Sequence, residues 1–468
     1  MEDDPTAISR PARPVSPGRP RAARDYTRGN LHVNIWLLAW PMVADMLSSS
    51  VYQIVDVYWL GKLGSAALAA ATLATVIRWV LNSLAMGLGI GGLAVVARRI
   101  GEGDEATANH TAWQVLVMAA GVSGVVGGAG FVLAEPILQP LGAEPEVVAL
   151  GVPFLRISFA GLGAIGVLQS CNALLRGAGE ARTAMWTMWV ANGSAIVLAS
   201  LLITGNLGFP ALGVPGSALA MVLGYTLGVV SAVAMLLSGR LRLHLCLRDF
   251  RLDLPLMWHV IKIALPSTVQ MTLRASSRLV TTTIMAPFGT AVLAGYGVAN
   301  RILMFALIPG FGFGNAAGTL VGQNLGADEP KRAAQSAWLV AAYNVAIIAI
   351  FITLFLAFTQ PIVTFFSSEP EVVSFAQEVI TIIGLSFLVT TVGVVMGRSL
   401  DGAGATLPAM VINLTTLWGV QIPAAYGLAN WMSLGTRGLW LGFAVANVVN
   451  GLLMAGWFLR GSWKKRQV

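Results

Sequence analysis

The sequence predicts an all-α integral membrane protein whose twelve transmembrane helices form two pseudo-symmetric six-helix lobes around a central cleft. Three observations lead to this prediction. First, 56% of the 468 residues are hydrophobic and only 11% are charged, whereas a soluble globular chain carries about 25% charged residues. Second, the apolar runs continue over the roughly 20 residues that cross a bilayer, and they lack the alternation of membrane-barrel strands. Third, the chain contains an internal duplication.

The duplication keeps one register along most of the chain. The segment Leu141–Val148 returns as Phe366–Val373, a spacing of 225 residues (366 − 141). Because each copy contains an even number of spans, both copies begin and end on the same side of the membrane, which makes them parallel repeats. Transporters commonly bind substrate between such repeats. Further pairs at this spacing are Pro41 and Pro266, Gly87 and Gly312, Gly101 and Gly326, and Trp113 and Trp338.

Each repeat supplies six apolar runs, the first within residues 31–238 and the second within residues 256–460. Most of these runs are long enough to cross the hydrocarbon layer as a helix. In chain order the predicted spans are 33–59, 66–97, 109–133, 147–173, 183–203 and 214–238 in the first lobe, and 256–286, 291–321, 334–357, 372–398, 406–428 and 438–460 in the second.

Three polar segments lie outside the predicted lobes. Residues 1–30 are rich in Pro and Arg, bury too little apolar surface to become ordered, and lack the apolar core of a signal peptide. Residues 239–255 alternate basic and apolar side chains, which predicts an amphipathic linker on the cytoplasmic surface. Residues 461–468 form a basic C-terminal tail. Basic tails of this kind can contact anionic lipid headgroups.

Charge is distributed unequally between the two sets of loops. Basic residues such as Arg98, Arg176 and Lys331 follow even-numbered spans, whereas the opposite loops carry acids such as Glu144 and Glu369. By the positive-inside rule we expect both termini to be cytoplasmic, in a multi-pass protein of the plasma (inner) membrane. The formal net charge of +8 is spread over loops instead of gathered on one folded domain, so nucleic acid is not an expected partner.

Enzyme signatures are missing from the sequence. The glycine cluster at 87–92 lacks the Lys-Ser/Thr that completes a phosphate loop, and in an apolar helix it favours close helix packing. The four histidines and two cysteines show no metal-ligand spacing. We therefore expect no enzymatic activity and no cofactor beyond a coupling ion. No dimer motif is evident, so we expect a monomer.

Charged side chains inside a span cost about 2.5–3.5 kcal/mol each at the helix centre, so each calls for an explanation. Asp45 and Asp56 lie 11 residues apart in the first span (56 − 45), which places both on one helix face about 16 Å apart. With Tyr52 and Gln53 between them, and Asn192 in the fifth span, they are the predicted site of cation or proton coupling. The alternative for each acid is a structural bond to a Ser, Tyr or Arg of a neighbouring helix.

The second repeat breaks this symmetry. Gln270 and Thr281 stand at the positions equivalent to the two aspartates, and the seventh span carries Arg274 and Arg278 one turn apart. These arginines could bind an anionic substrate group, pair with a carboxylate, or reach the cytoplasmic mouth. Neutral polar, aromatic and Met side chains could line a cleft or pack between helices. The predicted substrate-cleft residues are Arg274, Arg278, Gln270, Asn413, Trp418 and Met86.

Several segments, in their order along the chain, resemble the multidrug and toxic compound extrusion (MATE) family of secondary transporters. The resemblance covers roughly residues 33–460 and both repeats. The segments that carry it are Pro41 followed by Ile54–Gly64, Ile100–Asp104, Leu174–Gly179, Asn324–Asp328 and Ile422–Pro423.

This resemblance implies export of organic, often cationic, small molecules, driven by inward flow of H⁺ or Na⁺. It also implies that Asp56 is the coupling carboxylate of the first span. The fifth span departs from the family pattern, because Ala195 and Ala199 stand where many prokaryotic relatives place Asn and Asp. The missing carboxylate favours H⁺ over Na⁺ as the coupling ion.

Two other functions remain open. One is a flippase for a lipid-linked oligosaccharide or polysaccharide, from the same superfamily, which a cleft lined by arginines would favour. The other is a membrane-embedded enzyme, for which the sequence offers no nucleophile, metal cluster or cofactor motif. The sequence does not identify the substrate.

Overall fold

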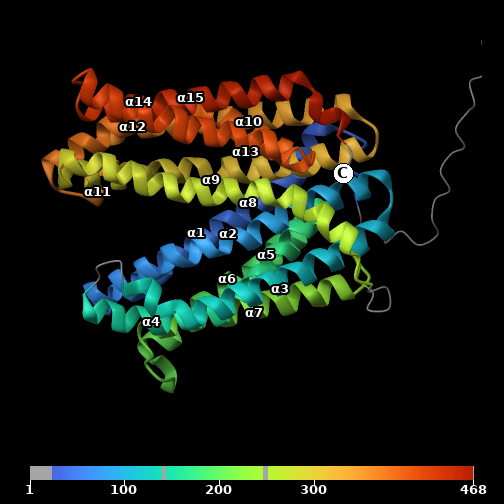
Figure 1. Ribbon diagram of the computed structural model, residues 1–468, viewed down its shortest axis with the longest axis horizontal. Coiled ribbons are helices and arrows are strands. Elements are labelled where there is room, and N and C mark those ends of the chain that lie inside the picture. The colour runs from blue at the N-terminus through green and yellow to red at the C-terminus, as the bar shows by residue number, and fades with distance from the viewer. Residues whose placement is uncertain (1–23, 140–143, 246–250, 467–468) are drawn as a thin grey trace, which may run out of the picture.

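The computed structural model describes residues 24–139, 144–245 and 251–466, and throughout these residues the regular structure is helical. The two repeats fold as two lobes that lie side by side (Figure 1). This confirms the predicted all-α, two-lobe fold. Parts of the expected tails and linker, at 1–23, 246–250 and 467–468, lie outside the described residues.

The first repeat forms the lower lobe in Figure 1, which we call the N-lobe. Its helices follow the predicted spans, with the fourth span divided into α4 and α5. They are α1 (Leu31–Gly61), α2 (Ser65–Glu102), α3 (Glu105–Leu138), α4 (Pro145–Ala160), α5 (Leu162–Gly177), α6 (Ala181–Thr204) and α7 (Val214–Leu237).

The second repeat forms the upper lobe, which we call the C-lobe. The eleventh span of the chain, which lies in this lobe, is irregular, because the π-helical segments η5 (Thr415–Gln421) and η6 (Gly427–Trp431) alternate with α-helix. Its helices are α8 (Leu254–Met285), α9 (Thr290–Gly326), α10 (Pro330–Ala357), α11 (Thr359–Phe366), α12 (Pro370–Gly402), α13 (Thr406–Leu414), α14 (Ile422–Tyr426) and α15 (Thr436–Arg460).

Judged by length and apolarity alone, seven of the described helices could cross a membrane, or eight if α4 and α5, bent by 49°, count as one span. Three of the helices outside that set, α1, α2 and α8, lie between the lobes, where they pack against α9 or each other. A helix that faces protein or a water-filled cleft tolerates polar residues that lipid would exclude. Charged residues such as Asp56 of α1 and Arg274 of α8 can therefore be accommodated there.

The cores of the lobes merge at the end of the molecule that carries the C-terminus. Ile35 and Leu38 of α1 are fully buried in one apolar cluster with Phe313 and Leu320 of α9. At the other end the ribbons of the two lobes diverge (Figure 1). The fold therefore joins two bundles through a contact that covers only part of their length.

Candidate functional site

The contact between the lobes is built on glycines related by the duplication. A Cβ atom at Gly87 of α2 would overlap Thr268 of α8, and one at Gly312 of α9 would overlap Val43 of α1. Both the glycines and their partners are 225 residues apart (312 − 87 and 268 − 43). The two repeats therefore make the same close helix approach twice, which only residues without side chains permit at these points.

Polar contacts extend this inter-lobe seal toward the end that carries the C-terminus. Gln323 of α9 donates from Nε2 to the carbonyl of Gly177 at 2.9 Å, and Thr319 donates from Oγ1 to the carbonyl of Arg176 at 3.0 Å. Gly326 packs against the backbone of α2. This end of the molecule is closed.

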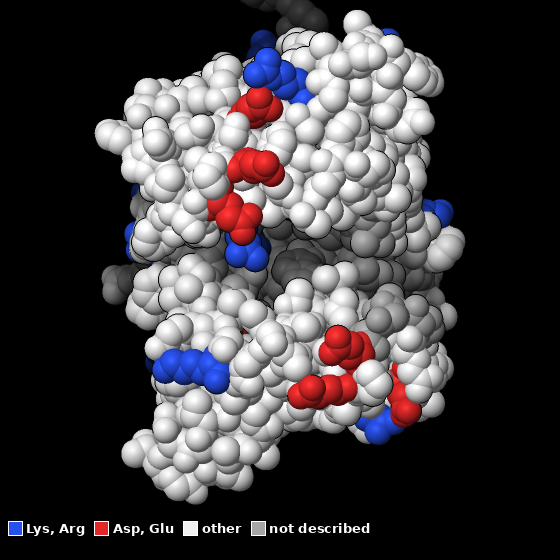
Figure 2. All heavy atoms as spheres, turned by 90° about the vertical axis from the view of Figure 1, so that its left-hand side faces the viewer, with Lys and Arg blue, Asp and Glu red and all other residues white. Residues whose placement is uncertain are grey.

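The opposite half of the interface is open. Figure 2 shows a hollow between the lobes, with acidic side chains on both sides of it. Along α1 and α2, Ile54 is 57% exposed and Val76 is 53% exposed. The molecule therefore has a central cleft that is sealed at one end and open at the other.

Asp56 sits in the N-lobe wall of this cleft, within a small polar cluster. Its carboxylate accepts a hydrogen bond from Ser217 Oγ of α7 at 2.5 Å. Arg78 of α2 lies near enough to act electrostatically on Asp56, and it also donates to the sulfur of Met221. Tyr52, one turn earlier on α1, is 8% exposed and also lies in the field of Asp56. The structure thus brings together two of the predicted coupling residues and adds Ser217 and Arg78.

Asp45 lies apart from that cluster and has its own partner. It forms an ion pair with Arg176 at the end of α5, in which the side chains are 5% and 17% exposed. Asp45 Oδ1 has no hydrogen-bond partner among the described residues. The guanidinium therefore neutralises this buried carboxylate beside the closed seal.

The other two predicted coupling residues are Gln53, which lies on α1 between the two aspartates, and Asn192, which lies on α6. Asn192 of α6 donates from Nδ2 to Ser48 Oγ at 3.1 Å and to Ser49 Oγ at 3.2 Å. Gln53 is exposed and donates only to the backbone carbonyl of Ser49, at 3.4 Å, among the described contacts. Asn192 therefore ties α6 to α1, whereas Gln53 stays outside the Asp56 cluster.

The fifth span supplies no polar atom to that cluster. Ala195 and Ala199 are buried, and Ala195 packs with Tyr52 and Met221 in an apolar group. Both fifth-span positions, 195 and 199, are thus apolar in this chain.

In the C-lobe, a chain of polar residues connects three helices. Arg274 of α8 donates to Asn413 Oδ1 of α13 at 3.3 Å, and Asn450 of α15 donates to the same oxygen at 3.1 Å. Asn450 also donates to Thr416 Oγ1 in η5 at 2.8 Å. These contacts hold together two of the predicted substrate-cleft residues at the start of the π-helical segment, a geometry that is frequent at functional sites.

The remaining predicted cleft residues lie on α2, α8 and η5. Gln270 and Met86 are half-buried on α8 and α2. Trp418 is half-buried in η5, and its Nε1 has no hydrogen-bond partner among the described residues. The side chain of Arg278 lies outside the described residues.

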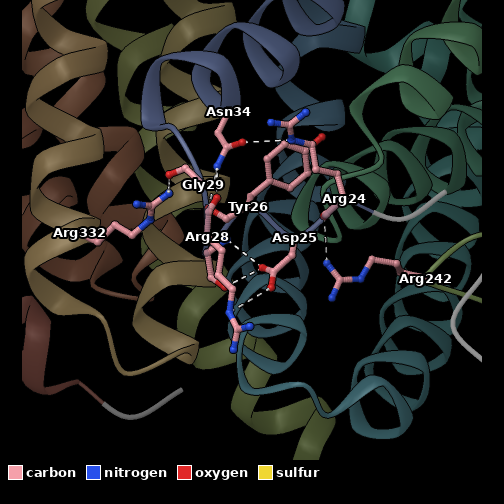
Figure 3. A network of polar contacts seen from close by, with 9 residues as sticks. Arg24, Asp25, Tyr26, Arg28, Gly29, Asn34, Arg242 and Arg332 are labelled. Carbon is pink, nitrogen blue, oxygen red and sulfur yellow. Dashed lines mark hydrogen bonds and ion pairs between the residues drawn. The ribbon is translucent and has the colours of Figure 1, made fainter. Parts of the chain in front are cut away.

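A segment before α1 bridges the lobes at the closed end, and we call residues 24–30 the N-terminal clamp (Figure 3). On the N-lobe side, Arg242 donates to the carbonyl of Arg24 at 3.3 Å, and the ring of Tyr26 packs against Gly179. On the C-lobe side, Arg332 of α10 donates to the carbonyl of Gly29 at 2.8 Å. We had expected these residues within a disordered tail, but the described part is ordered.

Hydrogen bonds from a buried side chain of α1 fix the backbone of the clamp. The side chain of Asn34 is fully buried and donates to the carbonyls of Tyr26 at 3.2 Å and Arg28 at 2.9 Å (Figure 3). Glu180 lies beside it, where burial raises the pKa of its carboxyl while the charge of Arg242 opposes that rise. Burial also raises the pKa of Tyr26, and the nearby Glu180 adds to the effect.

No group of three or more His, Cys, Asp or Glu side chains within the described residues could hold a metal ion.

Comparisons with known proteins agree with this architecture. The MatE family model matches residues 41–201 and 266–427, one segment in each repeat. A probable multidrug resistance protein, NorM, of Thermotoga maritima is 24% identical over 442 residues, which cover 92% of this chain and 93% of that protein. An FAD transporter of Shewanella oneidensis is 24% identical over 425 residues, covering 89% and 91%.

Solved structures show the same fold. A crystal structure of MATE in complex with MaL6 aligns with a TM-score of 0.88 at 23% identity, covering 94% of this chain and 99% of that one. An outward-facing conformation of a multidrug resistance MATE family transporter of the MOP superfamily aligns with a TM-score of 0.86 at 24% identity, covering 94% and 98%.

Proposed function

Because this chain belongs to the MatE family, a family of multi-pass membrane transporters, we propose that it is a secondary antiporter exporting amphipathic organic compounds, cations among them, in exchange for H⁺. The observation that carries the proposal is a cleft between two repeats that is sealed at one end and open at the other, with Asp56 in its N-lobe wall. Rocking one lobe against the other would exchange the sealed and open ends.

We further propose that the protein lies in the plasma (inner) membrane with both termini in the cytoplasm. The basic loops that support this orientation lie at the sealed end, where Arg98, Arg176 and Lys331 are found. The acids beside the open mouth, including Glu144 and Glu369, lie on the other side. In this orientation the structure is the outward-open state, and the acidic mouth raises the local concentration of protons and organic cations.

Asp56 is the proposed coupling residue. In the outward-open state it accepts a hydrogen bond from Ser217 and lies in the field of Arg78, which favour the carboxylate, whereas its burial favours the neutral acid, so the site can both take up and release a proton. A proton that arrives through the open mouth removes that charge and weakens both interactions. The cluster joins α1, α2 and α7, so its protonation changes how these helices pack and favours closure of the outer end.

H⁺ suits this cluster better than Na⁺. Hard cations are bound by several oxygen ligands, and the described partner of Asp56 is a single hydroxyl, with a guanidinium close by that repels a second cation. Ala195 and Ala199 offer no side-chain oxygen from the fifth span. Na⁺ remains the alternative coupling ion.

Asp45 has a supporting role in this proposal. Its ion pair with Arg176 satisfies most of its charge, and Arg176 also takes part in the inter-lobe seal through its carbonyl. Coupling through Asp45 would require a proton to compete with a bound guanidinium. We therefore assign Asp45 to holding the N-lobe part of the seal.

Efflux of a fluorescent organic cation tests the proposal. A pump-deficient bacterium would express either the wild type or Asp56→Asn, with the H⁺ and Na⁺ gradients collapsed separately. We expect wild-type efflux to stop when the pH gradient collapses, to persist without Na⁺, and to be absent in the variant. Efflux that follows the Na⁺ gradient alone, or that survives in Asp56→Asn, would contradict proton coupling at this residue.

A flippase for a lipid-linked oligosaccharide is the second candidate. The observation that favours it is the cationic Arg274, exposed on α8 and bonded to Asn413, because such lipids carry a phosphate or diphosphate linkage. A relative that is 24% identical is named an FAD transporter, and FAD carries an anionic diphosphate. Movement of a fluorescent glycolipid between leaflets of proteoliposomes, without efflux of soluble dyes, would select this candidate.

A further inference from the structure

One face of α9 is continuous from the inter-lobe seal into the open cleft. Gly312 on this face touches Val43 of α1. Arg301 lies 11 residues earlier (312 − 301), which is three helical turns plus about 20°, so it projects from the same side of α9 about 16 Å farther out. Arg301 and, one turn below it, Phe305 are both exposed. The face of α9 that seals the lobes at Gly312 therefore lines the cleft at Arg301 and Phe305.

The duplication identifies the equivalent residue in the N-lobe. Arg301 corresponds to Val76 of α2 (301 − 225), just as Gly312 corresponds to Gly87. Val76 is 53% exposed, and it lies 11 residues before the contact of Gly87 with α8. At this depth the cleft thus has a charged side chain in its C-lobe wall and an apolar one at the equivalent place in the N-lobe.

Among the described residues, Arg301 has no counter-charge of its own. Within the described part of the chain it makes neither a hydrogen bond nor an ion pair, whereas Arg156 pairs with Glu135 at 3.7 Å and Arg437 with Glu378 at 3.0 Å. An arginine facing acyl chains costs several kcal/mol unless it snorkels or faces a water-filled cavity. The cleft is such a cavity, and it leaves the guanidinium free for a ligand.

The acid of the coupling cluster does not neutralise this position. Asp56 lies 13 residues after Val43 on α1 (56 − 43), which turns it about 140° away from the face that meets α9. Its carboxylate points into the N-lobe, to Ser217 of α7. The proton site and the cation of the cleft wall are therefore separate.

We propose that Arg301 is a substrate-binding residue that takes an anionic group, a carboxylate or phosphate, of an amphipathic substrate. Phe305 and Val76 pack against the apolar body of that substrate. This inference rests on the proposed transport function and adds anionic and zwitterionic amphiphiles to its substrate class. A planar guanidinium suits this task, because it binds carboxylate and phosphate oxygens in pairs. The anionic group can belong to a soluble compound or to a lipid headgroup.

A matched pair of dyes tests the proposal. Rhodamine 110 carries a free carboxylate, and rhodamine 123 is its cationic methyl ester, so the two differ by one anionic charge. Proton-driven transport of both would be measured in proteoliposomes containing the wild type, Arg301→Gln, Arg301→Lys or the control Arg156→Gln, whose arginine pairs with Glu135 of α3. We expect Arg301→Gln to lower rhodamine 110 transport at least tenfold, leaving rhodamine 123 unchanged, and we expect partial recovery in Arg301→Lys.

A second arm separates the two sources of the anion. Quenching of tryptophan fluorescence in detergent would report binding of rhodamine 110 and of farnesyl diphosphate, which mimics a lipid-linked diphosphate. Arg301-dependent binding of either probe supports the site, and the probe that binds identifies its source. The site is refuted if Arg301→Gln binds both probes as the wild type does, if the wild type binds neither, or if both dyes lose transport equally. Wild-type failure to transport rhodamine 123 would instead count against the proposed function.

Discussion

The ion pair between Asp45 and Arg176 allows a quantitative prediction. Asp45 is 5% exposed at its side chain, and its second oxygen has no other partner among the described residues, so Arg176→Gln leaves a buried carboxylate with nothing to balance it. Breaking a buried pair from one side costs about 3–5 kcal/mol. Because Arg176 keeps 17% exposure, water can partly replace the guanidinium, and we expect a loss of about 3 kcal/mol.

The double variant isolates the pairwise interaction. Asp45→Asn combined with Arg176→Gln removes both charges, and it should cost less than the sum of the two single changes, with a coupling energy of at least about 2 kcal/mol. Reversible unfolding of the purified protein by sodium dodecyl sulfate in mixed micelles, followed by tryptophan fluorescence, would measure all four proteins. Single-variant losses below about 1 kcal/mol, or losses that simply add, would refute this reasoning.

Three further predictions concern the closed end. Gly326→Ala places a Cβ against the backbone of α2 and so pushes the lobes apart at the seal. We expect a cysteine introduced in the seal to react faster with a water-soluble thiol reagent in this variant. Gly121→Ala, whose Cβ meets open space, is the control. Tyr26→Ala should have the same effect by weakening the clamp, whereas Arg28→Ala, whose side chain is 88% exposed, should not; equal labelling in both would contradict the clamp. Burial raises the pKa of Glu180 in the folded state, so its ionised form costs stability at neutral pH and the cost disappears on acidification. The melting temperature should therefore change less between pH 8 and pH 5 in Glu180→Gln than in the wild type. An unchanged dependence on pH would show that Glu180 does not contribute to it.

The duplication predicted the fold and much of the interface. A constant spacing of 225 residues implied two equivalent lobes, and the glycines at 87 and 312 that share it are points of close approach between them. Their spacing carries this information because only glycine allows helix backbones to come so near. The cleft position of Arg301 follows from the same spacing combined with helical periodicity, once the structure shows which face of α9 meets α1.

The partners of the two aspartates were not predictable from the sequence. Ser217 lies 161 residues from Asp56, and a serine in an apolar span gives no signal that distinguishes a cluster member from a helix-packing residue. Arg176 was assigned to a cytoplasmic loop by its charge, and only the fold shows that it reaches Asp45. The order of residues 24–30 was missed because their composition resembles a tail, whereas the buried Asn34 and Tyr26 hold them against both lobes.

Proton release on substrate binding tests the central claim most directly. Purified protein in weakly buffered detergent, with a pH-sensitive dye, would receive a transported organic cation at a pH where Asp56 is protonated in the free protein. The account predicts release of close to one proton per bound substrate in the wild type, and none in Asp56→Asn that still binds the substrate. Release of the same size from Asp56→Asn, or binding without release from the wild type, would contradict proton coupling at Asp56.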